Sequence, residues 1–266
     1  MTARPAPLAV DAARIFEADY RVRFDEAGPD GSLRTSSYMR YAQDLAWRHS
    51  EALSFGRAWY AERSLTWLVR AAELAILADV PMGTILKART RVVGMRRVFA
   101  RRRGEFRLPD GQLAGWVHTD WVMIDGRGAL TRIPPIFGDM FGGDSMTGQV
   151  GRLALPPTPE GAPRRRFTVR PHELDPMDHV NNAVYLDWLE EAILASGRDG
   201  SGPAAIAAHP RHYRLEYPLA ASAGAEIETS AWADGRGWSH RVVDTTTGQD
   251  LFRARLEPGD GEEDTR

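Results

Sequence analysis

The sequence predicts an α+β fold in which one long helix is wrapped by a curved antiparallel sheet, and this unit occurs twice. Three observations support it. The 266 residues suffice for two domains of ordinary size, two amphipathic helical patterns lie far apart, and strand patterns follow each of them. A Gly- and Pro-rich stretch without a sustained period separates the copies. We therefore expect an N-terminal domain over 13–141, a linker over 142–165 and a C-terminal domain over 166–258.

Each half contains one long helical pattern. Aromatic and apolar residues recur at helical spacing over 38–53 in the first half and over 185–195 in the second. A turn-rich stretch precedes each pattern, and a short strand pattern precedes that stretch, at 19–25 and at 166–171. The order of elements is therefore the same in both halves.

Further strand patterns follow each helix, separated by turn sequences such as "PDG", "ADGRG" and "TTTGQ". The expected strands are 84–94, 97–108 and 112–125 in the first half, and 211–219, 225–234, 238–246 and 249–257 in the second. Short turns between consecutive strands predict antiparallel pairing.

The two halves form a faint internal repeat with an offset of 147 residues, which lays Tyr185 on Tyr38. The stretch "DPMDHVNNAVYLDWLEEA" then falls on "GPDGSLRTSSYMRYAQDL". The aligned pairs before the helix are Asp175 with Gly28, His179 with Ser32, Asn181 with Arg34 and Asn182 with Thr35. If both copies once had a site at this position, the second copy is the one that retains it.

Polar side chains crowd the start of the second helix, which we expect near Val180 to Asn182. A helix start offers unpaired N–H groups and a partial positive charge that can hold a developing oxyanion. A carboxylate and an imidazole beside it can activate water against a carbonyl. Asp175 and His179 are the candidates for that role. The simpler alternative, that these polar residues only cap the helix, stays open at this point.

Composition narrows the class of protein. The net charge of −2 does not favour a nucleic-acid partner, and the absence of cysteine excludes disulfides, a thiolate nucleophile and cysteine metal ligands. The start of the chain lacks a signal-peptide core, and no stretch approaches the length of a membrane helix, so we expect a cytoplasmic protein without membrane contact. The histidines show no metal-ligand spacing, and we expect no metal.

The run "HVNNAVYLDWLEEA" resembles the HVNN-x-x-Y signature of hotdog-fold thioesterases, and the two-half arrangement is similar to the acyl-ACP thioesterase family. Segments at 26–49, 64–92 and 130–134 resemble that family too, and the similarity extends over about 19–256. The resemblance implies two tandem hotdog domains and cofactor-free hydrolysis of medium- or long-chain fatty acyl thioesters. It also implies acyl carrier protein (ACP) as the partner and a place in fatty-acid synthesis.

The resemblance also implies catalytic residues. The family's aspartate falls on Asp175, its motif histidine on His179, and its catalytic glutamate, from a segment like "YRRE", on Glu216. The thioester carbonyl is expected to meet backbone N–H groups near His179 and Val180. Activation of water and direct attack by a carboxylate both remain open.

The resemblance implies supporting roles for two neighbours of this site, and the sequence departs from the family at two others. Asn181 and Asn182 are expected to support the loop. Met177 stands where the family usually has asparagine, so the polarisation of the carbonyl differs, and Tyr217 stands where many plant members have cysteine.

Other residues are candidates for the acyl pocket and for carrier binding. Met39, Trp67, Trp116 and Trp121 are candidates for lining the acyl pocket, with a plain core role as the alternative. The arginine clusters at 96–97, 101–103 and 164–166 are candidates for steering acidic ACP, with a solvated strand face as the alternative.

Two rival functions remain, and a third is disfavoured by spacing. An acyl-CoA thioesterase would use the same chemistry with another carrier, and a non-catalytic acyl-binding protein would fit the loss of asparagine at Met177. A hotdog hydratase needs an Asp-x-Asn-x-x-His spacing, which Asp175 to His179 does not supply. Monomer and homodimer are both compatible with the sequence.

Overall fold

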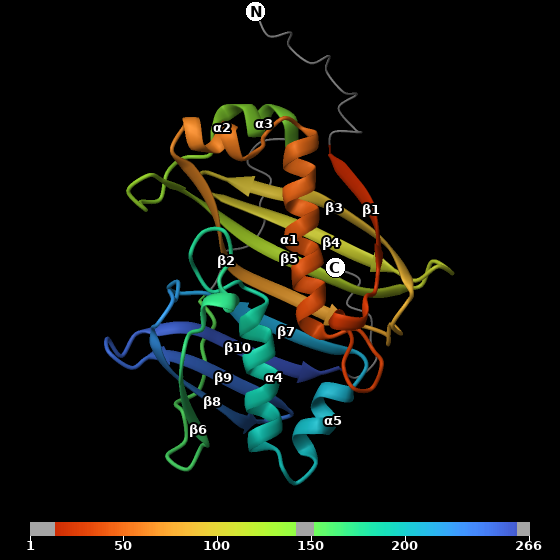
Figure 1. The fold of residues 1–266 in the computed structure, drawn as a ribbon, viewed down its shortest axis with the longest axis vertical. Coiled ribbons are helices and arrows are strands. Elements are labelled where there is room, and N and C mark those ends of the chain that lie inside the picture. The colour runs from red at the N-terminus through yellow and green to blue at the C-terminus, as the bar shows by residue number, and fades with distance from the viewer. Residues whose placement is uncertain (1–13, 142–151, 260–266) are drawn as a thin grey trace, which may run out of the picture.

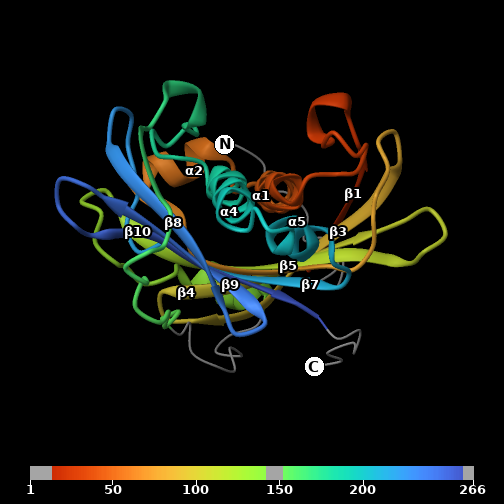
Figure 2. The ribbon, with the colours of Figure 1, turned by 90° about the horizontal axis from the view of Figure 1, so that it is seen from below.

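The computed structural model describes residues 14–141 and 152–259, so the expected tails and residues 142–151 of the expected linker lie outside the described residues. Two long helices, α1 (Thr35–Ala52) and α4 (Val184–Ser196), lie side by side against one face of a curved sheet (Figures 1 and 2). The predicted α+β class and both predicted helices are confirmed.

The sheet has ten strands in the order β1-β3-β4-β5-β2-β7-β10-β9-β8-β6, and each neighbouring pair is antiparallel. The strands are β1 (Ile15–Arg21), β2 (Leu65–Ile76), β3 (Ile85–Arg96), β4 (Phe99–Arg107), β5 (Leu113–Asp125), β6 (Arg164–Thr168), β7 (Arg211–Glu216), β8 (Glu226–Asp234), β9 (Gly237–Asp244) and β10 (Asp250–Pro258). Short helices α2 (Arg57–Glu62), α3 (Pro135–Phe141) and α5 (Ser201–Ala207) complete the fold.

Strand β2 joins the two halves and was not among the expected strands. It pairs with β5 on one side and with β7 on the other, where the register runs from Ala71 opposite Glu216 to Ile76 opposite Arg211. Its sequence, "LTWLVRAAELAI", shows no strict alternation and is rich in helix-forming Leu, Ala and Glu. Pairing on both edges therefore overrides the local helical preference.

Three expected strands end earlier than predicted. The patterns at 19–25 and 166–171 run into 3₁₀ turns at Phe24–Glu26 and Pro171–Glu173, and β7 stops at Glu216. Pro218, which has no N–H to donate to a ladder, follows closely. The other expected strands agree with the structure to within two residues at each end.

The loops before the two long helices have the same hydrogen bonds, which confirms the offset of 147 residues. Gly28 N–H donates to Ser32 O at 2.8 Å, and Asp175 N–H donates to His179 O at 2.8 Å. Inside each loop one residue has positive φ, 78° at Gly31 and 61° at its equivalent Asp178. Asp178, which stands where the first half has glycine, is of a residue type that tolerates this conformation.

A buried glutamate anchors each of these loops. Glu26 accepts the Tyr41 hydroxyl at 2.6 Å, and its equivalent Glu173 accepts the Trp188 indole N–H at 3.3 Å. Each glutamate also accepts the backbone N–H three residues before it, at 2.9 Å and 2.7 Å respectively. Tyr41 and Trp188 are themselves 147 residues apart. The same hydrogen bond therefore connects the turn to the long helix in both halves.

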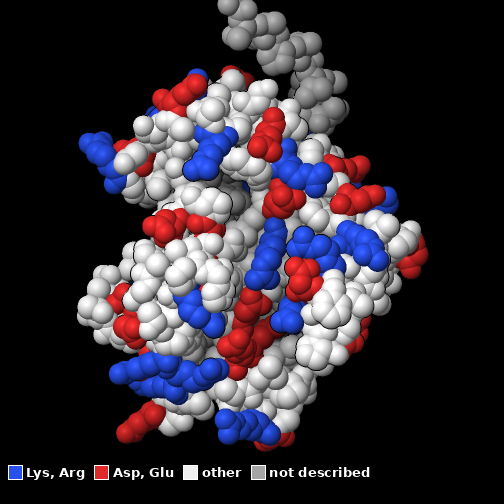
Figure 3. All heavy atoms as spheres, viewed as in Figure 1, with Lys and Arg blue, Asp and Glu red and all other residues white. Residues whose placement is uncertain are grey.

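The two helices meet at a pair of residues related by the same offset. Arg40 of α1 donates to Asp187 of α4 at 2.8 Å. Because equivalent residues of the two halves contact one another here, the approximate twofold axis of the molecule passes through this ion pair. Acidic and basic side chains are interspersed on the face that carries both helices (Figure 3).

Replacing Glu173 by alanine should lower the free energy of unfolding by about 3 kcal/mol, because buried donors lose their acceptor. Chemical denaturation measures this. Glu191→Ala, at an exposed position of α4, is the control and should change stability by less than about 0.5 kcal/mol. Equal stability of wild type and Glu173→Ala would contradict the anchoring role.

The same carboxylate should contribute to acid unfolding. Burial opposes its ionisation, but the hydrogen bonds from Arg170 outweigh burial and hold the pKa of Glu173 below its ordinary value. Its stabilisation is therefore present above the unfolded-state pKa of about 4.3 and is lost as pH falls through the lower folded-state pKa. The stability difference between wild type and Glu173→Gln should shrink across that acidic range.

Candidate active site

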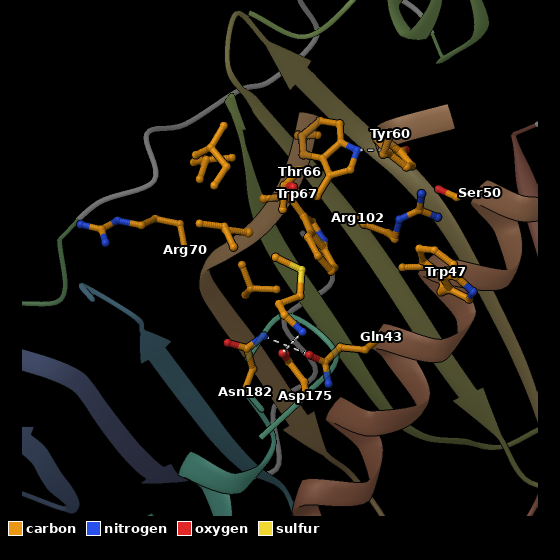
Figure 4. A pocket seen from close by; sticks show the side chains of 18 of the residues that line it. Gln43, Trp47, Ser50, Tyr60, Thr66, Trp67, Arg70, Arg102, Asp175 and Asn182 are labelled. Carbon is orange, nitrogen blue, oxygen red and sulfur yellow. Dashed lines mark hydrogen bonds between the residues drawn. The ribbon is translucent and has the colours of Figure 1, made fainter. Parts of the chain in front are cut away.

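A cavity of about 1310 Å³ is lined by both halves of the molecule (Figure 4). Most of its wall comes from α1, α2, α3 and strands β2 to β5 of the first half. The second half contributes the loop before α4 and the segment after β7, residues 217–220. An apolar chamber in one half therefore ends at a polar loop of the other.

The loop before α4 is held at its base by backbone hydrogen bonds. Val180 N–H donates to Ala221 O at 2.8 Å, and Asn181 N–H donates to Glu173 O at 2.9 Å. Helix α4 begins at Val184, later than the expected start near Val180 to Asn182. The N–H of Val180 is thus already used within the fold, which corrects the expectation that it meets a carbonyl.

Asp175 and His179 are brought together in this loop, and both line the cavity. One carboxylate oxygen of Asp175 accepts the Met177 N–H at 2.8 Å, which fixes its orientation. Within residues 14–141 and 152–259, no protein group is bonded to the other Asp175 oxygen or to the His179 ring. Both groups therefore remain available to a ligand.

Gln43 of α1 connects the two halves at this loop (Figure 4). Its amide N–H donates to Asn181 Oδ1 at 3.2 Å, and its carbonyl oxygen accepts from Asn182 Nδ2 at 3.0 Å. Tyr217 O–H adds a bond to Asn182 O at 3.1 Å. Gln43 was not among the residues predicted from the sequence. The available signal was a polar residue among the aromatic positions of the first helix.

The structure does not bring Glu216 to the cavity, which corrects the expectation that it shares a site with Asp175. Side chains alternate along β7, and Tyr217 packs on Tyr185 beneath the helices, so Glu216 points to the opposite face. There it accepts the Leu153 N–H and the Arg253 guanidinium, each at 3.0 Å. Glu216 is therefore a buried, fully engaged ion-pair partner.

Some of the residues predicted to line the acyl pocket do line the cavity, and others do not. Trp67, Trp121, Val180 and Met177 line the cavity, and the Met177 side chain is 40% exposed. Met39 and Trp116 are not among the lining residues. Met39 is completely buried in the core between helix and sheet, which corrects its assignment to the acyl pocket.

Two negative findings concern the part of the chain that the structure describes. Its His, Asp and Glu side chains form no group of three that could hold a metal ion. None of its helices is long and apolar enough to cross a membrane.

Comparison with known families agrees with this geometry. The model of the acyl-ACP thioesterase N-terminal domain matches residues 13–135, and that of the C-terminal domain matches residues 158–256. The chain belongs to the acyl-ACP thioesterase family. It is thus a thioester hydrolase that acts on acyl-ACP.

Solved structures show that this thioesterase shares its whole fold with others. A putative oleoyl thioesterase from Lactobacillus plantarum is 17% identical, with a TM-score of 0.76 over 93% of this chain and 96% of that chain. An acyl-ACP thioesterase from Bacteroides thetaiotaomicron is 15% identical, with a TM-score of 0.75 over 94% and 99%. The 12:0-ACP thioesterase from Umbellularia californica is 20% identical, with a TM-score of 0.75 over 95% and 98%. No curated protein matched the chain.

Gln43→Met should lower turnover about tenfold, because the loop loses both amide bonds that hold it to α1. Steady-state hydrolysis of an acyl-ACP measures the effect, with Glu51→Met on the exposed end of α1 as the control. Unchanged turnover in a folded Gln43→Met protein would show that the loop keeps its shape without the amide.

Glu216→Ala should destabilise the thioesterase by about 2 kcal/mol, because the Leu153 N–H loses its acceptor and Arg253 keeps only Asp250 as a carboxylate partner. Turnover of the remaining folded protein should stay within a few fold of wild type. Denaturant unfolding and activity, measured on the same samples, separate the two effects. A hundredfold loss of turnover at unchanged stability would instead show that Glu216 takes part in catalysis.

Proposed function

We propose that this thioesterase releases medium- or long-chain fatty acids from ACP, with Asp175 and His179 as its catalytic pair. The observation that carries the proposal is the position of these two side chains where an apolar cavity meets the polar loop. The N-terminal half, residues 13–141, holds the acyl chain. The C-terminal half, residues 166–258, supplies the reacting groups.

The walls of the cavity favour an acyl chain. They include apolar side chains from β2 to β4 and α3, namely Leu65, Val92, Met95, Phe99 and Phe137. Burying each methylene of a substrate chain against them contributes about 0.8 kcal/mol. A volume of about 1310 Å³ is ample for a chain of this class.

Two routes of hydrolysis share the geometry of the loop. In one, the free oxygen of Asp175 accepts a proton from water, whose oxygen attacks the thioester carbon. The C–S bond then breaks, and the proton passes from Asp175 to the leaving sulfur, so that the carrier leaves as a thiol. In the other, that oxygen attacks the carbon itself, the C–S bond breaks and the carrier leaves as a thiolate that takes up a proton. Water then hydrolyses the resulting anhydride, which releases the fatty acid and restores the Asp175 carboxylate. His179 orients the thioester in both routes.

Backbone groups support the proposed oxyanion position. The N–H groups of His179 and Asn182 donate to no other group in the described ranges, and both residues line the cavity. The side chain of Met177 cannot donate a hydrogen bond, but its backbone N–H holds the Asp175 carboxylate. The loop therefore keeps an oriented carboxylate without the asparagine usual in the family.

In the structure, the arginine clusters offer less free positive charge for steering the carrier than the sequence predicted. Arg101 pairs with Asp120 at 2.7 Å, and Arg103 pairs with Glu105 at 2.8 Å. Arg164 and Arg166 both pair with Glu228. Much of this basic charge is neutralised locally, so family membership is the stronger support for ACP as carrier.

Asp175→Asn should lower turnover by about 10² or more, because amide nitrogen and oxygen replace the group that accepts a proton or attacks carbon. Asp178→Asn is the matched control. It lies in the same loop, is exposed, does not line the cavity and has a positive φ that asparagine tolerates.

The measurement is thiol release from C8 to C18 acyl-ACPs and acyl-CoAs by wild type and both variants. Release from acyl-ACP that Asp175→Asn abolishes and Asp178→Asn retains is the expected result. Preference for acyl-CoA would establish the other carrier. Binding of acyl groups without thiol release by wild type would contradict catalysis and favour a non-catalytic acyl-binding protein.

A further inference from the structure

A small group of polar side chains interrupts the apolar wall of the cavity. Ser50 of α1, Tyr60 of α2 and Arg102 of β4 all line the cavity and lie near one another in Figure 4. We call these three residues the polar cluster. Around it lie Trp67 and apolar residues of β3, β4 and α3. The proposed chemistry of hydrolysis does not use any of the three.

The hydroxyls of the polar cluster are held in fixed positions. The Trp67 indole N–H donates to the Tyr60 hydroxyl at 3.1 Å, and Tyr60 is also hydrogen-bonded to Ser50. Burial raises the pKa of Tyr60, so its hydroxyl keeps its proton at neutral pH. The cluster is therefore ordered before any ligand enters.

Arg102 differs from its neighbours on β4. Arg101 and Arg103 each pair with a carboxylate, whereas no carboxylate in the described ranges forms an ion pair with Arg102. One N–H of its guanidinium donates to His49 Nδ1 at 2.8 Å. Burial lowers the pKa of Arg102 to about 10, and the group remains charged at neutral pH.

The Arg102 guanidinium is half-buried and has five N–H donors, and covering them with an apolar chain that brings no acceptors would be costly. His49 Nδ1 accepts one of them, and the cavity lies open to the residue. A wall that needed only to hold a hydrocarbon chain would be served by an apolar side chain at this position. The unpaired donors indicate a ligand that brings oxygen acceptors into the cavity.

The polar cluster lies away from the reacting groups. Gln43 contacts the catalytic loop, and Ser50 is seven residues further along α1. Those residues span about 10 Å of helix, roughly the length of seven or eight carbon–carbon bonds. The acceptor oxygen is therefore neither the thioester carbonyl nor the carboxylate of the product.

We propose that the substrate is an acyl chain with an oxygen substituent remote from the thioester, an inference that rests on the proposed function. A hydroxyl, an oxo group or a second carboxylate in the middle or distal part of the chain provides the required acceptor. Arg102 binds this oxygen, and the hydroxyls of Ser50 and Tyr60 complete its hydrogen bonds. The polar cluster then selects oxygenated chains over plain ones.

The test compares ACP thioesters of one chain length, dodecanoyl and its 8-, 10- and 12-hydroxy and ω-carboxy forms. Wild type should show a kcat/KM at least about tenfold higher for one oxygenated form than for dodecanoyl. Arg102→Met should remove this preference while leaving or raising hydrolysis of the plain chain. Arg107→Met, on the same strand but outside the cavity, is the control and should keep the wild-type ratio.

Two further measurements keep the outcomes distinct. Displacement of a fluorescent fatty acid by the free hydroxy, dicarboxylic and plain acids reports the same preference without catalysis. Tyr60→Phe should reduce the preference in part, and serves if Arg102→Met does not fold. Faster hydrolysis of dodecanoyl than of every oxygenated form, or an unchanged ratio in Arg102→Met, would overturn this inference and leave the thioesterase intact. No hydrolysis of any thioester would instead reject the proposed function.

Discussion

The antiparallel pairing of β2 with β7 is the interaction on which the rest of the structure depends. It joins two five-stranded halves into one sheet and sets α1 and α4 side by side on a single face. That placement carries Gln43 to the loop of the other half. It also makes the cavity a shared structure, with apolar walls from one half and polar chemistry from the other.

Duplication explains how the site could become one-sided. Both loops keep the same backbone hydrogen bonds and the same buried glutamate, so the scaffold of a site exists twice. In the first half, Gly28 and Ser32 stand where the second half has Asp175 and His179. The position of Gln43 is occupied by Glu190 in the second half, which accepts the Tyr213 hydroxyl at 2.7 Å. The first half thus has the same scaffold without the Asp and His side chains of the second.

The elements that depend on local sequence patterns could be predicted from the sequence. The prediction failed where the structure depends on strand pairing or on the direction in which a side chain points. Both long helices follow from aromatic spacing, and most strands follow from alternation and turn sequences. β2 was missed because its residues are at least partly covered on both faces, so its sequence does not alternate between apolar and polar residues. Glu216 was misplaced because one residue along a strand reverses the face, and the sequence alone did not fix which face met the cavity. Asp175 and His179, which both line the cavity, were predicted from the sequence because the repeat exposed their asymmetry.

The ion pair between Arg40 and Asp187 has a consequence for how this molecule can be assembled. In a symmetric pair of identical chains, the residue on the twofold axis meets its own copy, so a charged residue there faces like charge. Here the two positions are encoded separately, and one has become basic while the other has become acidic. Covalent linkage thus permits an attraction that no homodimer of either half could have. It also disfavours self-association of each half through this face, so that the correct partner is chosen within the chain.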